Sequence, residues 1–92
     1  FKMNRNRNRN ERVTTRDAIQ YVLRSNNESL TINDIVGKLY QLRDHNLFHI
    51  PEEKSESQFK AEVSSRSLQL YRDGEINRRI IDGIYTYTDM QG

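Results

Sequence analysis

Apolar residues recur at helical spacing in two segments in the first half of the chain. The first segment carries Ala18, Ile19, Val22 and Leu23, and the second carries Ile35, Val36, Leu39, Tyr40 and Leu42. Side chains three and four positions apart lie on the same side of a helix, so each segment predicts a helix with one buried side. Thr14 and Thr31 precede these runs, and each is followed three positions later by an aspartate, which is the pattern of an N-terminal capping box. We expect the first helix to begin at Thr14 and end near Ser25, and the second to run from Thr31 to about Arg43.

The segment from Asp44 to Lys54 has no regular pattern and predicts an irregular connection. Pro51 disfavours a helical conformation at Ile50, the residue before it. Leu47, Phe48 and Ile50 are the apolar residues of this segment, and we expect them to anchor it on the core.

A third helix is predicted from Ser55 to about Asp73. Ser55 and Gln58 form another capping-box pair, and Gly74 suits the left-handed conformation that ends many helices. The expected core side consists of Phe59, Val63, Ser67 and Leu70, with Tyr71 beside them. Leu68 lies off this stripe, where it could contact the hairpin described next or a partner.

The last third of the chain predicts a β-hairpin closed by Asp82-Gly83. This dipeptide favours a tight turn because both of its residues tolerate positive φ. Pairing outward from the turn matches Ile80 with Tyr85, Arg78 with Tyr87 and Ile76 with Asp89. Alternation then places Ile76, Ile80, Tyr85 and Tyr87 on one face, which we expect to pack on the core, with Arg79 and Thr86 on the other face. Arg78 shares the core-side face, and its long stem can carry the charge out to water.

Length and composition narrow the class of protein. A chain of 92 residues suits one domain, and the absence of cysteine excludes disulfides and thiolate-bound zinc. No run approaches the roughly 18 apolar residues of a membrane span, and no segment resembles a signal peptide. We therefore expect a protein of the cytoplasm or nucleus without a membrane partner.

The charge of the chain is concentrated at its start. Residues 1–13 hold five basic residues and one acidic residue, whereas the whole chain has a net charge of +2, so the remainder carries −2. Arginine and asparagine alternate in residues 4–10, with no apolar side chain to bury. We expect residues 1–13 to form a basic arm, with Arg5, Arg7 and Arg9 contacting phosphates or a minor groove, and residues 14–90 to form the domain. The alternative is a solvated leader or a vector-derived tail.

Two stretches of the chain resemble known helix-turn-helix families. The first stretch is similar to the opening of HARE-type helix-turn-helix domains. It consists of Thr15-Arg16-Asp17-Ala18-Ile19, then Val22-Leu23 and Leu30-Thr31-Ile32-Asn33-Asp34-Ile35. The second stretch is similar to the recognition helix and wing of modules appended to restriction endonucleases. It consists of Leu68-Gln69-Leu70-Tyr71-Arg72-Asp73-Gly74-Glu75-Ile76 and closes with Asp82-Gly83-Ile84-Tyr85. The resemblance covers residues 14–88.

This resemblance implies an α+β fold, a winged helix in which three helices are followed by a two-stranded antiparallel wing. It further implies a third helix that enters the major groove of DNA and a wing that contacts the backbone. Ser67 departs from the family pattern, which places an apolar residue there. Glu56 and Glu62 also depart from it, because phosphates repel carboxylates on the third helix.

The polar residues of the third helix and the wing have the chemistry that DNA recognition requires. Amides, hydroxyls and guanidinium groups bond base edges and phosphates. The candidate DNA-binding residues are Ser57, Gln58, Lys60, Ser64, Ser65, Arg66 and Gln69 on the helix, and Arg78 and Arg79 in the wing. A mixed, solvated helix face without a ligand is the alternative interpretation.

The sequence gives little support for catalysis or metal binding. Glu52-Glu53-Lys54 has the lettering of a nuclease metal site, but it lies in the irregular connection and lacks a supporting strand. His45 and His49 have helical spacing without an apparent third ligand. The chain also lacks a glycine-rich phosphate loop and a cysteine nucleophile. We therefore expect no catalytic residue, no metal and no cofactor.

Two functions remain open at this point. The first is a double-stranded DNA-binding winged helix that forms one module of a larger regulator or restriction protein. The second is a winged helix that binds another protein or another domain of the same chain, with Leu68 in the docking patch. The first is our leading hypothesis, and the second is a serious rival because the net charge of −2 outside the arm supplies little long-range attraction for DNA.

Overall fold

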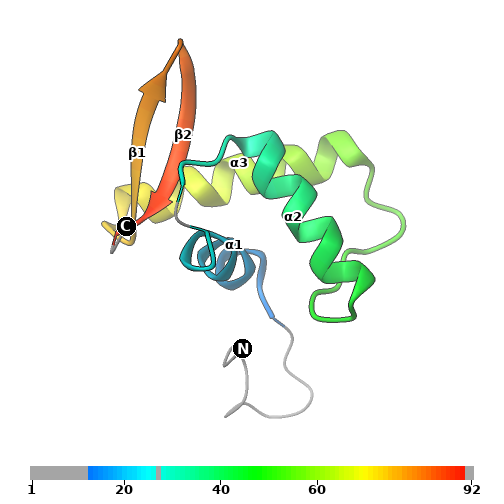
Figure 1. Ribbon diagram of the computed structural model, residues 1–92. Coiled ribbons are helices and arrows are strands. Elements are labelled where there is room, and N and C mark those ends of the chain that lie inside the picture. The colour runs from blue at the N-terminus through cyan, green and yellow to red at the C-terminus, as the bar shows by residue number, and fades with distance from the viewer. Residues whose placement is uncertain (1–12, 27, 91–92) are drawn as a thin grey trace.

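The computed structural model, which describes residues 13–26 and 28–90, contains three helices followed by a hairpin (Figure 1). The elements are α1 (Thr15–Arg24), α2 (Ile32–Asp44), α3 (Glu56–Arg72), β1 (Ile76–Ile81) and β2 (Ile84–Asp89). The two strands pair antiparallel in a two-stranded sheet. This confirms the predicted α+β layout, which is compatible with a winged helix.

The three helices begin where the capping residues predict. The Thr14 hydroxyl accepts a hydrogen bond from the Asp17 amide, with 3.1 Å between the two atoms. Thr31 with Asp34 and Ser55 with Gln58 form complete capping boxes, in which each side chain bonds the other residue's backbone amide. Satisfying these otherwise unbonded amides fixes the first turn of each helix.

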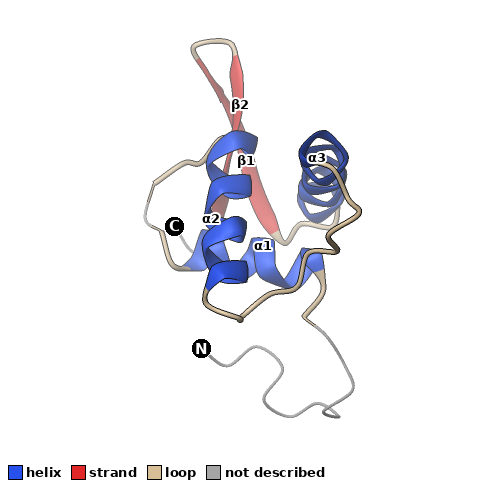
Figure 2. Ribbon diagram, turned by 90° about the vertical axis from the view of Figure 1, so that its right-hand side faces the viewer, coloured by secondary structure: helices blue, strands red, loops and turns tan. Residues whose placement is uncertain are grey.

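The core lies between the three helices and the part of the hairpin nearest to them (Figure 2). The predicted apolar sides of α1 and α2 are buried in it, except that Tyr40 and Leu42 are only partly buried. On α3 the predicted core residues Phe59, Val63, Ser67 and Leu70 are all buried. Tyr71 is more exposed than its place beside that stripe suggests.

The connection between α2 and α3 is irregular, as predicted, and two of its three apolar residues anchor it. Phe48 and Ile50 are buried, and the Phe48 ring packs on Phe59 with 6.2 Å between ring centroids. The predicted anchoring by Leu47 is wrong, because its exposed fraction is 41%. The preceding residue, Asn46, has a φ of 61° and ends α2, and the Leu47 amide donates to the Leu42 carbonyl at 2.9 Å, so Leu47 is held at the helix end.

Gly74 ends α3 in the left-handed conformation, with a φ of 77°. The Glu75 amide donates to the Leu70 carbonyl at 2.9 Å, and the Gly74 amide donates to the Tyr71 carbonyl at 3.1 Å. These two bonds form a Schellman motif, which satisfies carbonyls at the helix end and directs the chain into β1.

The hairpin has the predicted register. Ile80 pairs with Tyr85, Arg78 with Tyr87 and Ile76 with Asp89. The turn residues Asp82 and Gly83 have φ values of 53° and 79°, as the two-residue turn requires.

The predicted burial of the hairpin face is wrong at its far end. Ile76 and Tyr87 are 1% and 4% exposed, but Ile80 and Tyr85 are 61% and 49% exposed. Both views show the reason, since the hairpin extends beyond the helices and its turn is far from them (Figures 1 and 2). We call Ile80, Ile81, Ile84 and Tyr85 the hairpin tip; all four are exposed.

The base of the hairpin is joined to the loop between α1 and α2. Leu30 and Tyr87 form an isolated antiparallel bridge, in which each backbone amide donates to the other residue's carbonyl, at 2.9 and 2.8 Å. Thr86 is also buried, although it lies on the face opposite Tyr87. Side chains of β2 are therefore buried on both faces near the base, which alternation alone does not predict.

Candidate nucleic-acid interface

The outward side of α3 carries the polar residues that the sequence singles out. Ser57, Gln58, Lys60, Ser64, Ser65, Arg66 and Gln69 are all exposed. Ser57, Gln58, Ser65 and Gln69 lie away from the buried stripe and Lys60, Ser64 and Arg66 lie on its flanks, because α3 packs on the core with its other side.

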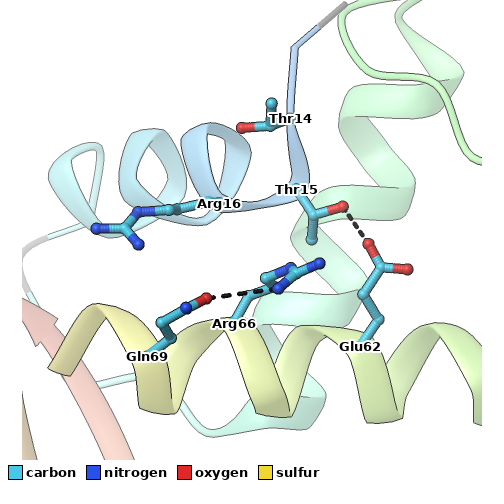
Figure 3. Close-up of a pocket in the computed structure, with 6 residues that line it drawn as sticks. All are labelled: Thr14, Thr15, Arg16, Glu62, Arg66 and Gln69. Carbon is cyan, nitrogen blue, oxygen red and sulfur yellow. Dashed lines mark hydrogen bonds between the residues drawn. The ribbon is translucent and has the colours of Figure 1, made fainter. Parts of the chain in front are cut away.

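Two neighbouring hollows lie along this side of α3 and share Arg66 and Gln69. The first, of about 410 Å³, lies between the start of α1 and α3 and is lined by Thr14, Thr15, Arg16, Glu62, Arg66 and Gln69 (Figure 3). The second, of about 360 Å³, continues toward the end of α3 and is lined by Ser65, Arg66, Leu68, Gln69, Arg72 and Asp73. Of the predicted helix residues, Ser65, Arg66 and Gln69 are therefore brought together, whereas Lys60 and Ser64 line neither hollow.

Glu62, in the first hollow, is neutralised by neighbouring groups. The Thr15 hydroxyl donates to Glu62 Oε2 at 2.5 Å, and Lys54 forms an ion pair with Oε1 (Figure 3 shows the first bond). Partial burial raises the pKa of Glu62, but the hydrogen bonds from Lys54 and Thr15 and the charges of Lys54 and Arg66 outweigh it, so the pKa lies below its usual value. The carboxylate is thus ionised yet compensated within the protein.

Asp73, the acid of the second hollow, is also paired. Arg16 Nη2 on α1 lies 2.8 Å from Asp73 Oδ2 at the end of α3. This pair joins two helices and is half exposed, so its contribution to stability is small. Its effect on the surface is clearer, because it removes an unbalanced negative charge from the hollow.

Two arginines of this surface, Arg66 and Arg72, and Arg79 on β1 form no ion pair in the described part of the chain. Arg66 donates only to the amide oxygen of Gln69, at 3.4 Å, as Figure 3 shows. Arg72 lines the second hollow, and Arg79 is exposed on β1. Among residues 13–26 and 28–90, none of the three forms an ion pair. Arg72 was not among the predicted site residues, although its position on the outward side of the helical wheel is a sufficient signal for it.

Two of the predicted DNA-binding side chains at the start of α3 are already engaged. The Gln58 side-chain oxygen accepts from the Ser55 amide at 2.9 Å, as part of the capping box. The Ser57 hydroxyl lies 3.3 Å from that of Ser55. Gln58 therefore keeps its amide hydrogens for a ligand, while its oxygen stabilises the helix start.

Arg78 has a structural role that the sequence did not indicate. Its guanidinium lies over the rings of Tyr71 and Tyr85, 4.5 and 4.3 Å from their centroids. The predicted alternation does place Arg78 and Tyr85 on one face, but the contribution of Tyr71 depends on how α3 and the hairpin meet. The stack connects the end of α3 to the far half of the hairpin.

Other candidate chemistry stays dispersed. In the described segments, no three His, Cys, Asp or Glu side chains gather in a way that could hold a metal ion. His49 lines a separate hollow near Pro51 and Glu52, and His45 caps the end of α2. Arg5, Arg7 and Arg9 lie outside the residues that the structure describes.

Comparisons of the chain with protein-family models, with curated proteins and with solved structures found no match. A search of the described helices for one long and apolar enough to cross a bilayer was also negative.

Proposed function

We propose that this chain is a winged-helix module that binds double-stranded DNA, with α3 in the major groove. In this arrangement the hairpin and the arm of residues 1–13 contact the backbone, and the module serves a larger regulator or restriction protein. A helix fits the width of the major groove, and a neighbouring β-ribbon can reach the adjacent backbone. The order of three helices and a hairpin is compatible with this geometry.

One observation carries the proposal, namely the distribution of charge around the two hollows. Glu62 and Asp73 are compensated by ion pairs with Lys54 and Arg16, whereas Arg66 and Arg72 form no ion pair among the described residues, although the charge of Arg66 also acts on Glu62. The local surface is therefore positive although the sequence beyond residue 13 carries a net charge of −2. Phosphates are attracted to such a patch even where the long-range field is weak.

The neighbouring polar groups suit base contacts. Gln69 and Ser65 lie beside Arg66 on the rim that the two hollows share. An arginine can donate two bonds to guanine, and a glutamine can both donate to and accept from adenine. This combination provides direct base readout next to phosphate contacts.

A salt series tests the proposal. Binding of the full chain to a mixed-sequence duplex is measured by fluorescence anisotropy at several salt concentrations. The double variant Arg66→Ala/Arg72→Ala should bind more weakly, and the slope of log affinity against log salt should flatten by about 0.9 for each phosphate that is no longer neutralised. Arg43→Ala is the matched control, because Arg43 lies beside Tyr40 and Asp44 and outside both hollows.

A second comparison separates α3 from the arm. A chain that starts at Val13 should bind less tightly but should remain sensitive to the Arg66 and Arg72 substitutions. If the shortened chain loses all binding and the double variant of the full chain binds normally, then only the arm contacts DNA and the proposal is wrong.

A further inference from the structure

The outer edge of β1 presents unpaired backbone groups. The amide and the carbonyl of Tyr87 both form hydrogen bonds with Leu30, so they point away from β1. Tyr87 and its partner Arg78 on β1 are therefore a pair without hydrogen bonds to each other. Antiparallel pairs alternate between bonded and non-bonded, so Ile80 and Tyr85 form another non-bonded pair. The amide and carbonyl of Arg78 and Ile80 therefore point to the outer edge, where no strand of the described chain pairs with them.

This edge has neither the bulge nor the proline by which many proteins protect exposed strands, and its charged residues are Arg78 and Arg79. The register runs without a bulge from Ile76 to Ile81, and β1 contains no proline. Arg78 is the charged residue nearest to Ile80 on the same face, but its guanidinium is held over Tyr71 and Tyr85. At the tip, Ile80, Ile81 and Ile84 are 61%, 44% and 55% exposed. An unpaired edge with apolar side chains on both faces is typical of a surface that binds another strand.

We infer that the hairpin tip is a self-association site, at which β1 of one copy pairs antiparallel with β1 of a second copy. Two hairpins then form one continuous four-stranded sheet, and the helical bodies lie at its opposite ends. The twofold axis passes between Ile80 and its equivalent, because a closed dimer brings the same surface of each copy together.

Charge selects this register. If Arg78 faced Ile80 of the second copy, the two Arg79 residues would stand directly opposite each other. A further shift would oppose the two Arg78 residues, and like charges at opposed positions destabilise a sheet. With Ile80 opposite Ile80, Arg79 faces Ile81, and Arg78 faces the turn that carries Asp82 of the second copy. Of the registers centred on Arg78, Arg79 and Ile80, only the one centred on Ile80 avoids opposing two arginines and also places Arg78 beside an acidic residue.

The same charge pattern disfavours insertion of the tip into DNA. Asp82 occupies the turn and is exposed, so it would meet the phosphates or the negative potential of the minor groove first. In the dimer it lies opposite Arg78 of the second copy, whose guanidinium keeps its charge while it stacks on Tyr71 and Tyr85. Insertion between base pairs would use only the residues at the turn of the hairpin. It therefore does not account for exposed apolar side chains on both faces of the strands.

Crosslinking tests the register directly. The chain has no cysteine, so a single substitution introduces the only thiol. In a hydrogen-bonded antiparallel pair the Cα atoms are about 5.5 Å apart, which suits a disulfide. Under mild oxidation, Ile80→Cys of the full chain should form a disulfide-linked dimer rapidly. Ile84→Cys is the control, because β2 lies on the side of β1 away from the second copy, and it should crosslink far more slowly.

Association in solution gives a second, independent measurement. Sedimentation equilibrium of the full chain should show a reversible monomer–dimer transition. Ile80→Pro removes an amide hydrogen that the hairpin itself does not use, and proline is tolerated at such edge positions. It should weaken the dimer by about tenfold or more, since both symmetric hydrogen bonds are lost, while Ile80→Val should associate like the wild type.

The inference is wrong if the wild-type chain stays monomeric over the whole concentration series. It is also wrong if Ile84→Cys crosslinks as fast as Ile80→Cys, or if Ile80→Pro associates normally with its fold intact by circular dichroism. None of these results involves DNA, so they leave the proposal for α3 standing, and a failure to bind DNA leaves the dimer standing.

Discussion

The base and the tip of the hairpin carry similar side chains in different surroundings. Ile76 and Ile80 lie on the same face of the same strand, yet Ile76 is 1% exposed and Ile80 is 61% exposed. The helices cover the first and end before the second. The alternation of side chains along a strand thus determines the face of the sheet on which a residue lies. Whether that residue is buried depends on where the neighbouring helices end.

The largest expected difference comes from truncating the two isoleucines. Ile76→Ala should destabilise the fold by roughly 2–5 kcal/mol, because it removes buried methyl groups and leaves a cavity. Ile80→Ala should change the free energy of unfolding by no more than about 0.5 kcal/mol when measured in dilute solution. Urea unfolding of both variants measures the contrast. Equal losses would mean that the base and the tip do not differ in packing.

The connection between α3 and the base provides the next test. Gly74→Ala should cost about 1–2 kcal/mol, because a Cβ at a φ of 77° meets the neighbouring carbonyl. Gly37→Ala is the control, since Gly37 lies within α2 and is exposed, and alanine there should stabilise the helix slightly. Thermal unfolding of the two variants should shift in opposite directions.

The next prediction concerns the buried hydroxyl of Ser67 on the core side of α3, because alanine there removes the hydroxyl with little change in side-chain volume. Its hydroxyl is buried and has no hydrogen-bond partner in the described chain. Ser67→Ala should stabilise the protein by about 1 kcal/mol or more, because the cost of the unpaired hydroxyl disappears. Ser64→Ala, on the exposed side of the same helix, should gain only the smaller difference in helix propensity. A gain no larger at Ser67 than at Ser64 would indicate that the hydroxyl has a partner.

The stack on Arg78 tests whether the tip is coupled to the helices. Arg78→Met keeps a long apolar stem but removes the charge from between the rings of Tyr71 and Tyr85. We expect a loss of about 0.5–1 kcal/mol and faster hydrogen exchange in the far half of the hairpin. Unchanged exchange there would show that the tip is held by the strand pairing alone.

The smallest expected change in stability comes from substituting Glu62, which lies on α3 among the helices. Because its pKa is lowered on folding, its stabilising contribution is present above the usual value of 4.5 and is lost as the pH falls through the lowered value. Glu62→Gln should therefore be less stable than the wild type at neutral pH, and the difference should vanish below that window. A difference that does not vary with pH would contradict the role of Lys54 and Thr15 in stabilising the carboxylate.

Local signals in the sequence predicted the elements and their ends. Capping residues such as Thr31 and Ser55 bond amides within their own turn, and Asp82-Gly83 fixes the register through its own conformation. These interactions span a few residues, so a sequence pattern is sufficient to find them. On the helical wheel, the same local logic placed Phe59, Val63 and Leu70 on the core side of α3, where they are buried.

The features that were missed depend on contacts between distant segments. The exposure of Ile80, the stack on Arg78 and the bridge between Leu30 and Tyr87 all follow from how the hairpin meets the helices. The compensation of Glu62 likewise needs Thr15 from another helix. The spacing of apolar residues along the chain contains no information on these contacts between distant segments.

The bridge between Leu30 and Tyr87 has a consequence for biosynthesis. More than half of the chain separates its two residues, and the second lies in the last strand. Closing so long a loop is slow compared with forming a helix, and it cannot start before the C-terminal strand exists. On the ribosome, the core beside α1 and α2 is therefore completed only after β2 has emerged.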